Sequence, residues 1–314
     1  MRAVNSAHID RFRDDLSALI NPQHMQLGVA VSGGGDSLAL LLLAHAAFSG
    51  RVSAATVDHQ LRPEARAEAE FVAERCRELG VAHIILTPSA PISGSLQAGA
   101  RVARYAALER WADEAGCSVI ATAHHIDDQA ETLLMRLNRG AGVAGLAGIR
   151  AQNGRIIRPV LGWRRAELAA VVADAGWDSV DDPSNHDANF DRVAMRQHVA
   201  NSDWLDVKHL ARSAALLAEA NTALDWAADD LIKTRLVFGA NSVKFDPILL
   251  PRELRRRLTL RALRHIDPNL EPRGEALVGL IEALGRGETR TLGQALIRGG
   301  AIWRFAPAQP RRKN

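Results

Sequence analysis

Short apolar stretches of the sequence alternate with longer stretches of helical character, and this alternation constrains the fold more than any other feature. The apolar stretches lie at residues 27–32, 52–58, 83–87, 118–123 and 155–160. Helical patterns lie between them, near residues 36–48, 63–79, 95–115 and 126–138. Strands that are apolar on both faces and alternate with helices are typical of a doubly wound parallel α/β sheet. Ligands bind such sheets beyond the carboxyl ends of the strands, so we expect the functional residues there.

The length of the chain, 314 residues, suits two domains rather than one. We expect residues 1–204 to form the α/β domain around the parallel sheet. From about residue 205 to about residue 285 the sequence is rich in alanine, leucine and arginine and keeps a helical pattern. Residues 205–314 are therefore expected to form a smaller, mainly helical C-terminal domain, which ends in a short hairpin at IRGGAIW (297–303).

The sequence carries no signal of export or membrane insertion. The first twenty residues are charged throughout and lack the apolar core of a signal peptide. No apolar run approaches the roughly 18 residues of a membrane span. The two cysteines, Cys76 and Cys117, are too far apart for a C-x-x-C metal site and too few for a disulfide framework. We expect a cytoplasmic protein without a membrane partner.

The segment SGGGDS, residues 32–37, joins the first apolar stretch to the first helical stretch. It is not a Walker A loop, because no lysine precedes residue 208, and its contiguous glycines do not match the G-x-G-x-x-G dinucleotide fingerprint. Glycines let backbone N–H groups approach an anion, and the following helix adds the positive end of its dipole. The segment therefore predicts a phosphate site with Ser32 and Ser37 as hydroxyl donors.

Asp36 stands where the phosphate should bind, and it would repel a bare anion. A Mg²⁺ ion between the carboxylate and the phosphate oxygens would satisfy both groups. The simpler alternative is that Asp36 only complements the start of the helix. Because three glycines and two serines surround it, we expect a phosphate site with Asp36 as its metal residue.

A second group of chemically informative residues follows the fourth apolar stretch, in ATAHHIDDQAET (121–132). Asp127, Asp128 and Glu131 fall within about one helical turn and repel each other. Acids at a helix N-terminus are favourable, which accounts for one or two of them. Their position beside His124 and His125 at the carboxyl edge of the sheet predicts a cation there, either Mg²⁺, an amine or both. The roles of the two histidines stay open.

A third group is the pair Arg101 and Arg104, which are three residues apart and so share one helical face. Two arginines near the carboxyl edge of the sheet could hold the terminal phosphates of ATP. A solvated arginine face is the alternative.

The loop SGGGDS resembles the PP-loop of the N-type ATP pyrophosphatases, whose pattern is S-G-G-x-D-S. That resemblance implies cleavage of ATP between the α and β phosphates, adenylation of a substrate oxygen, release of pyrophosphate and displacement of AMP by a nucleophile. Five further blocks narrow the resemblance to the bacterial tRNA(Ile)-lysidine synthetase family over about residues 25–200. They are VDHQLRPEARAEAEFV, ARVARYAAL, ATAHHIDDQAETLLMRLNRGAGVAGLAGI, RPVLGWRRAEL and WDSVDDPSNHDANFDR.

The family joins free L-lysine to C2 of the wobble cytidine in an isoleucine tRNA with a CAU anticodon, using ATP and Mg²⁺, so the resemblance implies roles at the matching positions. ATP would be bound by Ser32, Gly33, Gly34, Gly35, Asp36, Ser37, Asp58 and Arg104. The catalytic residues would be Asp36, Arg104, Asp128 and Glu131. The lysine substrate would be bound by Asp128 and Glu131, the metal by Asp36, and tRNA by Arg192 and Arg196. One departure is Val193, where the family usually has asparagine.

The C-terminal part of the chain carries many basic residues, which as a set suit the phosphates of a tRNA backbone. They are Arg255, Arg256, Arg257, Arg286, Arg290, Arg298, Arg304, Arg311, Arg312 and Lys313. We therefore expect residues 205–314 to bind tRNA. Scattered solvated arginines are the alternative. The sequence leaves the oligomeric state open, with a homodimer as one option.

Three other functions compete with this interpretation. A tRNA-thiolating enzyme of the same superfamily would need a catalytic cysteine pair or an iron–sulfur cluster, which Cys76 and Cys117 do not suggest. A small-molecule ligase such as an NAD or GMP synthetase has little use for an arginine-rich C-terminal domain. A non-catalytic adenine-nucleotide sensor would need the glycine loop but not the acids at 127, 128 and 131.

Overall fold

The computed structural model describes residues 3–23, 25–59, 65–88, 96–178, 191–272 and 274–308. The chain forms two compact units, Met1–Ala218 and Glu219–Asn314. The division falls within helix α9 (Val207–Arg235), whereas residue 204 precedes that helix. The motif DDPSN at residues 181–185 and the basic residues Arg311, Arg312 and Lys313 lie outside the described residues.

The first unit contains the doubly wound sheet that the sequence predicts, in the order β3-β2-β1-β4-β6-β5. Its parallel strands are β1 (Leu27–Ala30), β2 (Val52–Val57), β3 (Ala82–Leu86), β4 (Val119–Ala121) and β6 (Ile156–Ile157). A short antiparallel strand, β5 (Gln152–Asn153), borders β6 at one edge and was not expected from the sequence. The chain order reverses between β1 and β4, so the crevice beyond the carboxyl ends of these two strands is the expected ligand site.

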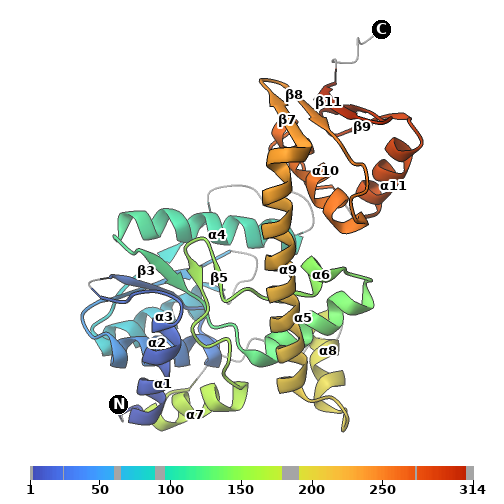
Figure 1. Ribbon diagram of the computed structural model, residues 1–314. Helices are drawn as coiled ribbons and strands as arrows, with labels where there is room; N and C mark the ends of the chain where they lie inside the picture. The colour runs from blue at the N-terminus through green and yellow to red at the C-terminus, as the bar shows by residue number, and fades with distance from the viewer. Residues whose placement is uncertain are drawn as a thin grey trace. The chain divides into compact units, whose positions relative to one another are not determined.

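Helices cover both faces of this sheet (Figure 1). The helices of the first unit that precede α9 are α1 (Ser6–Ser17), α2 (Gly35–Ala47), α3 (Ala65–Leu79), α4 (Leu96–Glu114), α5 (Ile126–Asn138), α6 (Val143–Leu146), α7 (Arg165–Ala175) and α8 (Asp191–Ala200). Helix α2 is apolar nearly all round, and its residues 37–44 are buried between the sheet, α1 and α7. Leu108 and Trp111 of α4 pack on the opposite face. The sheet edge that carries the glycine loop is thereby fixed between two packed layers.

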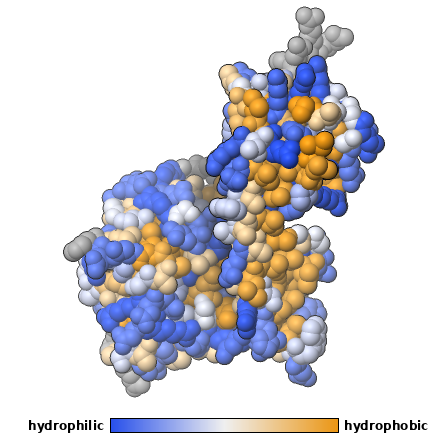
Figure 2. All heavy atoms as spheres, viewed as in Figure 1, coloured by the Kyte–Doolittle hydropathy of each residue, from blue (hydrophilic) through white to orange (hydrophobic). Residues whose placement is uncertain are grey.

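The surface of the first unit is not uniformly polar. In Figure 2, hydrophobic residues gather on the part of the first unit where α5 and α6 lie. Among the described residues, no helix has the length and apolar character needed to cross a membrane.

The second unit contains the expected helices and, in addition to the predicted hairpin, a five-stranded antiparallel sheet in the order β7-β8-β11-β10-β9 that the sequence did not predict as a whole. Its elements after α9 are β7 (Leu236–Gly239), β8 (Ser242–Phe245), α10 (Arg252–Ile266), α11 (Gly274–Gly285), β9 (Thr289–Leu292), β10 (Ala295–Arg298) and β11 (Trp303–Pro307). The predicted hairpin is confirmed as β10 and β11. The hairpin of β7 and β8 was not predicted, because each strand is only four residues long and β7 directly follows the long helical pattern of α9.

The charged residue Arg257 is buried inside the second unit, with 6% of its side chain exposed. Its guanidinium donates to Glu253 Oε1 (2.8 Å), Asp225 Oδ1 (2.6 Å) and Asn221 Oδ1 (2.8 Å). The last two acceptors lie on α9 and the donor on α10, so this network joins the two helices. A buried guanidinium needs all of these acceptors, since an unpaired charge is costly in a protein interior.

We expect Arg257→Ala to lower the free energy of unfolding by about 2 to 3 kcal/mol, because it leaves the buried Asn221 Oδ1 without its donor and removes one of the donors of Asp225. Urea unfolding followed by circular dichroism measures this. Arg252→Ala is the matched control, since the Arg252 side chain is exposed and 3.9 Å from its nearest acidic oxygen on Glu282. An equal effect of the two substitutions would show that the network does not stabilise the unit.

Candidate active site

The glycine loop between β1 and α2 is held by its own serines. Ser37 Oγ accepts a hydrogen bond from the backbone N–H of Ser32 (3.1 Å) and donates one to the carbonyl of Gly34 (2.8 Å), and Ser32 Oγ lies 3.2 Å away. Gly33 has φ +90°, a left-handed conformation that a residue with a side chain rarely adopts. Helix α2 begins at Gly35, so its free N–H groups and positive dipole end point out of the loop.

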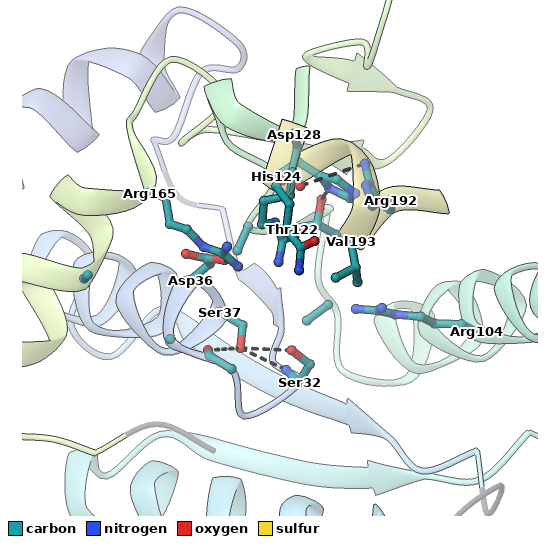
Figure 3. A pocket seen from close by; sticks show the side chains of 17 residues that line it. Ser32, Asp36, Ser37, Arg104, Thr122, His124, Asp128, Arg165, Arg192 and Val193 are labelled. Carbon is teal, nitrogen blue, oxygen red and sulfur yellow. Dashed lines mark hydrogen bonds and ion pairs between the residues drawn. The ribbon is translucent and has the colours of Figure 1, made fainter. Parts of the chain in front are cut away.

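A cavity of about 660 Å³ opens at this edge of the sheet, as Figure 3 shows. The loop contributes Ser32, Gly34, Gly35, Asp36 and Ser37. The rest of the lining includes Arg104, Thr122, His124, Asp128, Arg165, Arg192, Val193 and Arg196. Of the residues expected to bind ATP, Gly33 and Asp58 are not part of this lining, and Asp58 is buried directly after β2. The remaining six meet in one cavity.

Arg104 projects from α4 into the cavity (Figure 3) and is half-buried. Within the described part of the chain it makes no hydrogen bond or ion pair, and burial lowers the pKa of its guanidinium. Arg101, the other member of the predicted pair, instead lies over the ring of Tyr105 and donates to its hydroxyl (3.3 Å). The two arginines therefore differ, and Arg104 is the one available to an anion.

The three acids of α5 take three different positions. Asp127 accepts from the backbone N–H of Arg165 (2.9 Å) and pairs with the guanidinium of Arg164 (3.1 Å), so it joins α5 to the start of α7. Asp128 accepts from the backbone N–H of His125 (3.0 Å) and faces the cavity beside the loop.

Glu131 is the most buried acid of α5, with 2% of its side chain exposed. Its Oε1 accepts from Arg196 Nε (2.9 Å), and its Oε2 lies 3.3 Å from Arg192 Nε without accepting a hydrogen bond. Glu131 lines a second cavity rather than the first. Arg192 and Arg196, predicted to contact tRNA, are thus paired with an acid of their own unit.

His125 lies among the acids that the sequence predicts to need a cation. Its Nε2 is 3.3 Å from Asp36 Oδ2 and 3.6 Å from Asp128 Oδ2, and its Nδ1 is 3.5 Å from Asp127 Oδ2. Burial by itself would lower the pKa of His125, but hydrogen bonds and the charges of the three carboxylates raise it to about 9. His125 is therefore an imidazolium at neutral pH and supplies part of the expected positive charge.

The neighbouring His124 has the opposite character. Burial lowers its pKa to about 4, and Asp128 only partly offsets that effect. Its Nδ1 lies 3.1 Å from Thr122 Oγ1, and the neutral ring lines the cavity. Adjacent histidines thus carry different charges because only one of them faces three carboxylates.

Asp36 is held by protein cations on two sides. Burial would raise its pKa, but the hydrogen bond and charge of His125, together with Arg165 and Arg196, lower it. Its Oδ2 lies 3.6 Å from Arg165 Nη2, and Figure 3 shows the two side chains directed toward each other. Arg165 and His125 were both missed as partners of the loop. One feature of the sequence could have identified Arg165 as a residue of the site. It lies at the start of a helix that follows the fifth apolar stretch, and so at the carboxyl edge of the sheet.

Comparison with known proteins agrees with this geometry. Residues 7–203 match the family described as "PP-loop domain", so the fold and the loop define a PP-loop protein. The chain is 43% identical to a tRNA(Ile)-lysidine synthase of Zymomonas mobilis, over 100% of this chain and 98% of that protein. It is 44% identical to one of Novosphingobium aromaticivorans, over 98% of this chain and 96% of that protein. The chain belongs to the tRNA(Ile)-lysidine synthase family and is an enzyme, which confirms the resemblance seen in the sequence.

A solved structure supports the fold alone. The U34-tRNA thiolase NcsA from Methanococcus maripaludis superimposes with a TM-score of 0.55 at 16% sequence identity, covering 70% of this chain and 78% of that one. In this chain Cys76 and Cys117 are buried and neither lines the cavity. Among the described residues, no cluster of three or more histidine, cysteine or acidic side chains is arranged to hold a metal.

Arg104→Ala should weaken ATP binding about 10-fold to 100-fold, because charge-assisted hydrogen bonds to phosphate contribute about 1.5 to 3 kcal/mol. Arg101→Ala, one helical turn away, should change the affinity less than about 3-fold. Isothermal titration calorimetry with a non-hydrolysable ATP analogue measures both. Similar losses in the two variants would assign the effect to general charge rather than to the cavity.

Proposed function

We propose that the enzyme ligates L-lysine to C2 of the wobble cytidine of the isoleucine tRNA with a CAU anticodon, using ATP. The relatives named tRNA(Ile)-lysidine synthase match nearly the whole chain, which supports this reaction. The observation that carries the proposal is the first cavity, which is lined by the glycine loop, by Asp128 and by Arg104, whose guanidinium has no partner among the described residues. Such a cavity can bind the phosphates of a nucleotide beside the amine of a second substrate.

In the first step, the wobble cytidine O2 attacks the α-phosphorus of ATP. The O2–Pα bond forms, the bond from Pα to the β-phosphate oxygen breaks, and pyrophosphate leaves. The loop N–H groups and the N-terminus of α2 would hold the phosphates, and Arg104 would balance the charge that grows on the departing pyrophosphate. The adenylated oxygen turns an unreactive carbonyl carbon into a site with a leaving group.

In the second step, the lysine ε-amine attacks C2 and the C2–O bond breaks to release AMP. A free lysine ammonium has a pKa of about 10.4, so it arrives protonated and must lose a proton first. Asp128 is our choice for the proton acceptor, because it lines the same cavity as the loop, whereas Glu131 lines the second cavity. Glu131 would then bind the ammonium group without taking its proton.

Mg²⁺ fits this site if substrate phosphates supply most of its ligands and the protein supplies only one or two carboxylates. Asp36 and Asp128 present carboxylate oxygens to the cavity, and Mg²⁺ usually takes one or two carboxylates together with substrate phosphates and water. Asp36 would hold the ion, and when bound the ion would neutralise phosphate charge. An enzyme that uses tRNA, ATP and free lysine would act where these are present, which supports a cytoplasmic location.

The direct test is to incubate the protein with ATP, L-lysine and the CAU-anticodon isoleucine tRNA and to measure the mass of the digested nucleosides. We expect the wobble cytidine to gain one lysine residue, with pyrophosphate and AMP released in equal amounts. A tRNA of unchanged mass, or one modified without lysine, would contradict the proposal.

The two acids should give different kinetic signatures if Asp128 takes the proton and Glu131 binds the ammonium. We expect Asp128→Asn to lower kcat for lysine transfer at least about 100-fold. Glu131→Gln should mainly raise the KM for lysine. ATP binding by both variants serves as the folding control. If Glu131→Gln lowers kcat while Asp128→Asn raises only KM, the two roles are exchanged.

Binding of tRNA by the second unit is also part of the proposal, but the structure divides its arginines into two groups. Arg257 is buried in the α9–α10 network, Arg256 pairs with Glu253, and Arg286 and Arg290 both pair with Glu288. Arg255 donates to the carbonyl of Leu250. These side chains are already engaged within the unit, so they are poor candidates for phosphate contacts.

Arg298 and Arg304 belong to the other group. On the exposed face of the sheet, Arg304 lies opposite both Lys244 of β8 and Arg298 of β10 in the strand register. Among the described residues, none of the three has an acidic partner. Like charges directly opposite each other weaken a sheet, so a polyanion across this row would relieve the repulsion. We name Lys244, Arg298 and Arg304 the basic row.

Replacing the basic row by alanine should weaken tRNA binding and flatten its dependence on salt. The slope of log K against log salt should fall by about 0.7 to 0.9 for each phosphate contact removed. Filter binding from 50 to 300 mM salt, roughly, spans a useful range. The control is Arg252→Ala with Arg264→Ala and Arg286→Ala, which removes the same charge from the same unit. Equal slopes for the two triple variants would exclude the row as a tRNA contact.

A further inference from the structure

Arg165, the first residue of α7, has a fixed backbone and a loosely held side chain. Its backbone N–H donates to Asp127 Oδ2 (2.9 Å), and α7 packs against α2 within the first unit. Its side chain is 42% exposed, and among the described residues its guanidinium has one partner, Asp36, with 3.6 Å between Nη2 and Oδ2. That distance is too long for a hydrogen bond, and partly exposed ion pairs are weak. The side chain can therefore leave Asp36 while α7 stays folded.

The carboxylate oxygen that Arg165 approaches is also the oxygen nearest to His125. Asp36 Oδ2 lies 3.3 Å from His125 Nε2 and 3.6 Å from Arg165 Nη2, so two nitrogen atoms crowd it. A guanidinium is charged at every physiological pH, and a dipositive ion placed at the same carboxylate would repel it. Arg165 and the Mg²⁺ ion proposed for this site would therefore compete for Asp36.

Arg165 has an alternative partner within reach of the same cavity. Its side chain lines the first cavity together with the glycine loop and Arg104, and Figure 3 shows the two arginines entering from different sides. The sequence led us to expect two arginines at the phosphates, but Arg101 lies over the ring of Tyr105 instead. Phosphates bound at the loop would give the guanidinium of Arg165 an anion of higher charge than a carboxylate.

We propose that Arg165 exchanges partners when the site fills, pairing with Asp36 in the empty enzyme and with a nucleotide phosphate once Mg²⁺ takes its place at Asp36. This inference rests on the proposed function, in which Asp36 holds the ion. The exchange makes metal binding and nucleotide binding cooperative, because each removes a competing interaction that opposes the other. It also keeps the empty enzyme from binding the free ion tightly.

The first test uses Mn²⁺ as the probe in place of Mg²⁺ and measures unbound Mn²⁺ by electron paramagnetic resonance, without nucleotide. Arg165→Gln should bind Mn²⁺ at least about 10-fold more tightly than the wild-type protein, since Asp36 loses a competing cation. Adding Asp36→Asn to that variant should abolish the gain. The matched control is Arg101→Gln, which removes the same charge from the same unit and should change the affinity less than about 3-fold. Circular dichroism of each variant verifies its fold.

The second test measures the affinity for a non-hydrolysable ATP analogue by isothermal titration calorimetry, with and without Mg²⁺. With Mg²⁺, Arg165→Gln should weaken binding about 10-fold, because a charge-assisted contact to phosphate is lost. Without the metal the loss should be less than about 3-fold, since Asp36 then holds the guanidinium. In an Asp36→Asn background, Arg165→Gln should again weaken binding about 10-fold, even without the metal, because nothing then competes for the guanidinium.

Equal Mn²⁺ affinities for Arg165→Gln and Arg101→Gln would overturn the exchange. Equal losses of nucleotide affinity with and without Mg²⁺ would also overturn it, by making Arg165 a permanent phosphate contact. Neither test uses lysine or tRNA, so either result leaves the proposed ligation intact. Wild-type nucleotide binding that does not respond to Mg²⁺ would instead overturn the metal role of Asp36 in the proposed function, and the exchange with it.

Discussion

An imidazolium surrounded by three carboxylates holds together the elements that meet at the carboxyl edge of the sheet. His125 lies within 3.3 to 3.6 Å of Asp36, Asp127 and Asp128, which come from two different helices. Without its charge, the acids after β1 and β4 would repel one another across the crevice. The same charge lowers the pKa of Asp36 and so keeps a carboxylate next to a loop built for phosphates.

The arginines near His125 pair differently with the acids of α5, so that these acids take different roles. Asp127 is bound by the backbone and side chain at the start of α7, and Glu131 is bound by Arg192 and Arg196 of α8. Asp128 is left facing the loop. One acidic cluster in the sequence thus becomes a structural link, a cavity wall and a candidate proton acceptor.

In the second unit, basic residues likewise differ in whether they are paired with acids. Arginines that are neighbours in the sequence differ in the structure, because the helix turns some of them toward acids of α9 and leaves others outside. The exposed basic row is assembled from β8, β10 and β11, which the strand register brings together. Sequence proximity is therefore a poor guide to which cations are available to a partner.

The sequence by itself determined the parallel sheet, the position of the phosphate loop, the family and most of the first cavity, because these depend on local patterns and contiguous motifs. The strand ranges it predicted agree closely with β1 to β4, and SGGGDS marks the loop directly. Only the tertiary structure decided the charge of His125, the difference between Arg101 and Arg104, and the pairing of Glu131. Each of these depends on side chains that approach from distant segments, and no local pattern encodes the distance between such groups.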